Sequence, residues 1–107
     1  MAVEKYLQGQ QITYQVDTTE LGTVSNFKVE IAQNKITKYT FLYPYPAEPN
    51  ENEKELTKDG AIFSGTLTSE MTSTMRGLFT IEVTNLDGVN ENDKGGSPFI
   101  IISEEAL

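Results

Sequence analysis

The chain has 107 residues with sixteen acidic and eight basic side chains, which gives a net charge of −8. This length fits one domain of ordinary size, so we expect residues 1–107 to form a single domain. The excess of negative charge repels nucleic-acid phosphates and anionic membrane surfaces, which disfavours both as partners. With no cysteine and no histidine, the chain has no disulfide framework and lacks the commonest strong nucleophile and general base.

No apolar segment of the sequence approaches the roughly 20 residues that span a bilayer. The longest uninterrupted apolar run is Phe99 to Ile102. The N-terminal residues show neither the basic segment nor the apolar run of a signal peptide. We therefore expect a protein that is cytoplasmic when synthesised and that makes no membrane contact.

Apolar side chains recur at every second position in several short stretches, which is typical of strands with one buried face. Asn34-Lys35 and Asp59-Gly60 are predicted turns between such stretches. We expect strands at residues 12–16, 27–31, 36–45, 63–67, 79–83 and 99–103, with a seventh within residues 3–7. The apolar members expected to face the core are Phe27, Val29, Ile31, Phe41, Phe63, Ile81 and Val83.

Residues 68–75 give the one indication of a helix. Serine and threonine supply N-caps there, and Met71 and Met75 have the i, i+4 spacing of one helix face. Three threonines and two serines in eight residues nevertheless disfavour a long helix. The sequence therefore predicts a single helical turn within residues 68–77.

Two acidic loops are predicted, at residues 46–58 and 86–96, and we expect them to be the most mobile regions. The proline-rich segment that starts at Pro44 cannot join a central ladder, because proline lacks the N–H donor. The second loop is rich in the oxygen ligands that calcium prefers, but its spacing departs from that of a calcium loop, with Lys94 at a ligand position. We expect it to hold no metal.

Short strands separated by turns, with at most one turn of helix, are typical of a β-sandwich or a small barrel. We predict an all-β fold, an immunoglobulin-like antiparallel sandwich of about six to seven strands. No serine stands in a Gly-X-Ser-X-Gly elbow, and the acidic residues concentrate in loops. We therefore expect no enzymatic activity, no catalytic residues and no cofactor.

Aromatic side chains alternate along the third predicted strand, at Tyr39, Phe41, Tyr43 and Tyr45. Rings spaced along one strand face suit a platform on which sugars stack. Aromatic residues also dominate the cores of sandwiches, and a binding platform would more typically contain tryptophan, which is absent. We favour the core and keep Tyr39, Tyr43 and Tyr45 as the alternative ligand-stacking residues.

Phe99, Ile100, Ile101 and Ile102 are consecutive apolar residues, whereas a half-exposed strand should alternate. One core buries only one pair, so the other pair needs a separate cover. The cover is either the loop Pro44 to Glu55 of the same chain or another protein, and the sequence leaves both open. Pro98 resembles a guard against edge pairing. These four residues are the predicted interface.

The order of features from Asp59 to Ser103 resembles the last three strands of an immunoglobulin-like sandwich. Phe79 stands where such folds often have the tyrosine of a tyrosine corner, and it lacks the hydroxyl group. The segment is also similar to small sandwich domains of bacteriophage tail and baseplate proteins, including the N-terminal type of baseplate upper protein. Leu67-Thr68-Ser69-Glu70 and Gly77-Leu78-Phe79 match their pattern, while Gly96-Ser97-Pro98-Phe99 departs from it by an inserted proline.

The resemblance implies a structural or adaptor role in a phage or prophage particle, a location in the virion, and no catalytic residues. The partners would be proteins, either further copies of the chain or other particle components. Two alternatives remain: a carbohydrate-binding module that uses the tyrosine face, and a small acidic intracellular inhibitor or partner of a basic protein. Fold alone does not choose among them.

Overall fold

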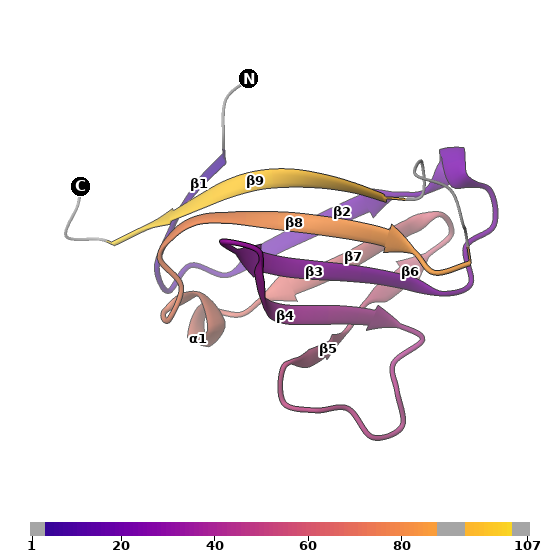
Figure 1. Cartoon of the computed structure of the whole chain (residues 1–107), viewed down its shortest axis with the longest axis horizontal. Coiled ribbons are helices and arrows are strands. Elements are labelled where there is room, and N and C mark those ends of the chain that lie inside the picture. The colour runs from indigo at the N-terminus through magenta and orange to yellow at the C-terminus, as the bar shows by residue number, and fades with distance from the viewer. Residues whose placement is uncertain (1–3, 88–93, 104–107) are drawn as a thin grey trace.

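A computed structural model describes residues 4–87 and 94–103, which form two sheets (Figure 1). One sheet has six strands in the order β1-β9-β8-β3-β4-β5, and the other has three in the order β2-β7-β6. The strands are β1 (Glu4–Leu7), β2 (Ile12–Asp17), β3 (Phe27–Gln33), β4 (Ile36–Tyr43), β5 (Glu53–Glu55), β6 (Thr57–Asp59), β7 (Ile62–Leu67), β8 (Gly77–Asn85) and β9 (Lys94–Ile102).

Large aromatic side chains from both sheets fill the space between them. The rings of Phe27 and Phe63 stack at a centroid distance of 4.6 Å, and Tyr14 meets Phe41 edge-on at 5.4 Å. The two inner faces therefore interdigitate as in a sandwich. Of the predicted core residues, five are buried, whereas two on β8 are only partly buried at its margin. The buried ones are Phe27, Val29, Ile31, Phe41 and Phe63, and the partly buried ones are Ile81 and Val83.

The sheet order is that of a variable-type immunoglobulin domain, in which two extra strands extend the sheet that contains the last strands. Here β4 and β5 are those extra strands, and β2, β7 and β6 form the smaller sheet. The first strand, β1, pairs in parallel with the last strand, β9. The predicted all-β, immunoglobulin-like sandwich is confirmed, with two more short strands than the sequence indicated. Within the described residues, no helix is long and apolar enough to cross a membrane.

The turns that the sequence predicts are present. Asn34 and Lys35 both have positive φ values, 53° and 67°, as a two-residue type I′ hairpin turn requires. They join β3 to β4, whose pairing contains an irregularity between Ile31 and Ala32. Because Ile31 pairs with Tyr39 and Ala32 with Thr37, Lys38 is the extra residue of a β-bulge.

The predicted helical turn is α1 (Ser69–Thr72), inside the expected window. Thr68 is its N-cap, because its hydroxyl accepts a hydrogen bond from the Met71 amide at 3.2 Å. Met75, just after the turn, is fully buried and anchors it to the sandwich. A second short helical element, a 3-10 turn, covers Thr19–Leu21.

The predicted loops are shorter than expected. Residues 46–58 contain β5, which pairs in parallel with β4, and most of β6, and β9 begins inside the second predicted loop. The sequence conceals β5 and β6 because they are edge strands of three residues with charged side chains, which show no apolar alternation. Leu56 between them is buried. Residues 88–93, with most of the candidate calcium loop, lie outside the described residues.

Candidate functional site

The predicted interface strand β9 directs its apolar side chains to opposite faces of the six-stranded sheet. Phe99 and Ile101 are 2% and 1% exposed and belong to the core, where Phe99 stacks on Phe79 at 5.6 Å. These two members of the predicted interface are therefore not accessible to a partner. Ile100 and Ile102 lie on the outer face and are half-buried.

Two apolar residues from neighbouring strands join them on this outer face. Leu78 of β8 is the direct cross-strand partner of Ile100, and Leu7 of β1 is the partner of Ile102. Leu78 is 56% exposed, which is unusual for a leucine in the middle of a sheet. We call Leu7, Leu78, Ile100 and Ile102 the outer apolar patch.

The loop Pro44 to Glu55 does not cover this patch. The loop leaves β4 and returns as β5, at the opposite edge of the sheet from β1 and β9 (Figure 1). Strands β8, β3 and β4 lie between β9 and β5, so the separation across the sheet is roughly 19 Å at the usual strand spacing. The same-chain cover that the sequence left open is therefore wrong.

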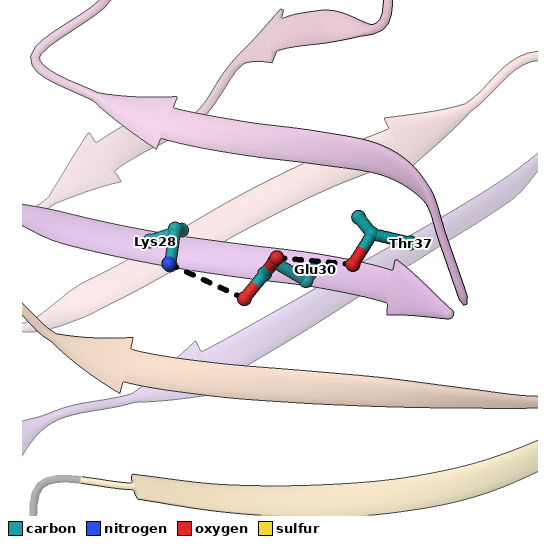
Figure 2. Close-up of polar contacts among 3 residues, drawn as sticks. All are labelled: Lys28, Glu30 and Thr37. Atoms are coloured by element: carbon teal, nitrogen blue, oxygen red, sulfur yellow. Dashed lines mark hydrogen bonds and ion pairs between the residues drawn. The ribbon is translucent and has the colours of Figure 1, made fainter. Parts of the chain in front are cut away.

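The middle of the outer face is polar. The Nζ atom of Lys28 lies 3.3 Å from a carboxylate oxygen of Glu30, and Thr37 donates a hydrogen bond of 3.1 Å to the other oxygen (Figure 2). Glu30 pairs across the strands with Glu82, so Lys28 offsets the repulsion between two like charges. This partly exposed ion pair contributes at most about 1 kcal/mol to stability. The ion pair lies on β3, next to β8, so polar side chains border the outer apolar patch on this side.

The three candidate ligand-stacking tyrosines do not form a platform. Tyr39 and Tyr43 lie on the core side of β4, and Tyr43 meets Phe63 edge-on at 5.4 Å. Tyr45 lies beyond the end of β4 and is 39% exposed, with its hydroxyl donating to the Glu53 carbonyl at 3.0 Å. The core interpretation holds for the first two residues.

Two open hollows flank the β-bulge of β4. They have volumes of about 530 and 400 Å³ and share Thr37, Lys38 and Asn52 in their walls. Their lining is mostly polar, and sequence reasoning did not find them, because the bulge that creates them depends on the pairing of β3 with β4. Within residues 4–87 and 94–103 no group of three or more acidic side chains could hold a metal ion.

The two aspartates with perturbed pKa values serve the fold. The Asn26 side chain and the Ser25 and Asn26 amides donate to Asp87 and lower the pKa of its carboxyl group, which ties the end of β8 to the start of β3. The Thr19 hydroxyl and amide lower the pKa of Asp17 in the same way. Each carboxylate accepts hydrogen bonds from a neighbouring turn, and Asp17 is the one acidic residue among the described residues that line its cavity.

Comparison with known protein families gives no matching family, and comparison with curated protein sequences gives no match. Among solved structures the chain is similar to the NK cell receptor Nkp44, described as a triggering partner in natural cytotoxicity. The TM-score is 0.57 at 14% sequence identity, over 97% of this chain and 100% of that one. At this identity the likeness shows the fold, an immunoglobulin-like β-sandwich.

Proposed function

We propose that this domain is a non-catalytic contact module that joins protein subunits through the outer apolar patch, and that a second copy of the chain is its partner. The observation that supports this role is the placement of Leu78 directly opposite Ile100, with its side chain 56% exposed. Isolated exposed apolar residues are normal, whereas adjacent, partly exposed apolar side chains on three neighbouring strands favour a contact surface.

The energy available from this surface favours a weak contact. Covering the exposed parts of Leu78, Ile100 and Ile102 contributes on the order of 3 kcal/mol for each copy in the complex, since full burial of such a side chain is worth about 1.5–3 kcal/mol. The two patches of a pair together contribute roughly 6 kcal/mol, which is similar to the lower part of the about 4–15 kcal/mol that association costs. The patch therefore suits an assembly in which several weak contacts act together.

Charge acts against the contact between copies. Each chain carries a net charge of −8, so two copies repel each other, and dissolved salt screens that repulsion. Self-association through an apolar patch should therefore strengthen as the salt concentration rises. An interface built on ion pairs would weaken under the same conditions.

A phage tail or baseplate is the assembly that the resemblance of residues 59–103 suggests for such a module. The structural neighbour is described as a triggering partner. That description agrees with the use of this fold for contacts between proteins, and the agreement extends no further than the fold. The carbohydrate alternative gains no support from Tyr39 and Tyr43, which face the core. The acidic-inhibitor alternative rests on net charge alone.

Sedimentation of the purified protein over a range of concentrations tests the proposal. We expect the average mass to rise with concentration for the native chain and to stay that of a monomer for Leu78→Thr. Ile36→Thr is the matched control, because Ile36 is 73% exposed but lies outside the outer apolar patch. A native chain that remains monomeric at high salt and high concentration would refute self-association through this patch.

A further inference from the structure

Strand β2 has a free edge. It pairs with β7 on one side, and within the described chain no strand pairs with its other side. In sandwiches whose smaller sheet has the order A-B-E-D, the first strand covers this position. Here the first strand, β1, pairs with β9 of the other sheet, so no strand of the described chain lies on that side of β2.

The pairing of β2 with β7 determines which backbone N–H and C=O groups of β2 point toward its free edge. The Thr18 amide donates to the Ala61 carbonyl at 2.8 Å, in the same register as the rest of the pair. Along a strand of an antiparallel pair, the backbone groups of successive residues point alternately toward the partner strand and away from it. Since Thr18 points toward β7, the N–H and C=O groups of Thr13, Gln15 and Asp17 point away from β7. No backbone partner for these groups is present in the described chain.

The edge lacks the usual protections against pairing. Ile12–Asp17 contains no proline, and its pairing with β7 runs without a bulge. Its one charged side chain, Asp17, is at the end of the strand. A regular edge of this kind is a template for another strand.

A cavity of about 280 Å³ opens beside this edge, between the two sheets. Tyr14 and Val16 of β2 line one side, and Gly96 of β9 lines the other. Ile81 and Val83 form an apolar wall and are only partly buried, although they face inward. Strand β1 pairs with Phe99–Ile102 of β9 and does not reach this part of β9 within the described chain.

We infer that an extended segment of a basic partner protein binds here as a fourth strand, antiparallel to β2, and inserts apolar side chains at alternate positions into the cavity. The unpaired backbone groups of β2 require an extended backbone, and the apolar wall requires apolar side chains on its inner face. The net charge of −8 and Asp17 at the edge favour lysine or arginine on the outer face. This inference does not depend on the proposed function, because it concerns a different surface.

A capped heptapeptide of alternating lysine and valine is the probe. In an antiparallel pair, directly opposite residues share a face, and in every second opposite pair the two residues also exchange both hydrogen bonds. Valines in the cavity therefore place the lysine amides against Thr13, Gln15 and Asp17, and the valine amides away from β2. N-methylation of the lysine amides should abolish binding, whereas N-methylation of the valine amides should preserve it. Both modified peptides keep the same charge.

Protein variants give a second, independent test. Gln15→Pro removes an outward N–H without removing a hydrogen bond to β7, and should weaken peptide binding about tenfold, the loss expected for one hydrogen bond. Lys58→Pro is the matched control on the far edge of the same sheet, where Lys58 pairs with Phe63 and also points its N–H outward. We expect Lys58→Pro to bind as the native chain does. Thermal unfolding of both variants confirms that they fold.

Nuclear magnetic resonance reports the site directly, because the amide signals of Thr13, Gln15 and Asp17 should shift when the peptide binds. Equal binding of both N-methylated peptides would show attraction by charge alone and overturn the inference, as would no binding at millimolar peptide. Loss of binding on valine methylation only would contradict the antiparallel arrangement. Self-association of the free protein that Gln15→Pro removes and Leu78→Thr leaves intact would assign the edge to a second copy and overturn the assigned partner.

Discussion

The hydroxyl of Tyr14 is buried between the sheets and has no hydrogen-bond partner among the described residues. Burial raises the pKa of this phenol well above its ordinary value, so the group stays neutral and does not become a buried charge. An unsatisfied buried hydroxyl costs about 1–3 kcal/mol, and phenylalanine has the same shape without it. Tyr14→Phe should therefore stabilise the domain by about 1 kcal/mol, which raises the melting temperature by roughly 4–8 °C for a domain of this size.

Urea unfolding of the native chain and Tyr14→Phe at equal concentration measures this difference. An unchanged slope with a higher midpoint would place the effect in the folded state. A loss of 1 kcal/mol or more would refute the reasoning, because it would mean that the hydroxyl makes a hydrogen bond that stabilises the fold.

Gly65 provides a check on the same packing. A methyl group at Gly65 would overlap the Tyr14 ring and lie 3.0 Å from Cδ2 of Phe41. Replacing glycine by alanine in a strand ordinarily gains about 0.5–1 kcal/mol, but here the overlap should cost about 1–3 kcal/mol. A stabilising Gly65→Ala substitution would show that the Tyr14 ring is free to move.

Four further substitutions test other parts of the fold. Thr68→Ala should cost about 1 kcal/mol in urea unfolding, because it removes the N-cap of α1. Phe27→Ala should lower the free energy of unfolding by about 3–5 kcal/mol. Ile81→Ala, at the wall of the open cavity, should lower it by less than the roughly 2 kcal/mol usual for a buried isoleucine. Equal losses for the two variants would mean that the cavity is closed. The lowered pKa of Asp87 means that its contribution to stability is present above its ordinary value of about 3.9 and is lost as the pH falls through the lowered value. The difference in melting temperature between the native chain and Asp87→Asn should accordingly shrink as the pH falls below that ordinary value, and a constant difference would contradict this.

The alternating strands could be predicted because their apolar residues face one shared core. Phe27, Val29 and Ile31 follow this rule, and they are fully buried in β3. Strands β5 and β6 could not be predicted, because a three-residue edge strand is held by backbone hydrogen bonds and needs no apolar pattern. Local sequence does not encode which strands become neighbours.

The candidate site could be predicted in part. The consecutive apolar residues of β9 indicated that one pair needs a cover, but sequence alone did not tell which pair faces outward. Leu78 was missed, although it stands directly before Phe79 and so breaks the alternation of β8 in the same way. The free edge of β2 was also missed, because it depends on the pairing of β1 with β9.

The proposed contact through the outer apolar patch can be trapped directly, because the native chain contains no cysteine. Lys5→Cys places a single thiol beside Ile100 and keeps all four apolar side chains of the patch, and Lys58→Cys places one on an edge strand of the other sheet with the same change in charge. Under mild oxidation at high salt, Lys5→Cys should form disulfide-linked dimers much faster than Lys58→Cys, since the contact between two copies brings the patches together. Equal rates for the two variants would contradict the assignment of this patch as a subunit contact.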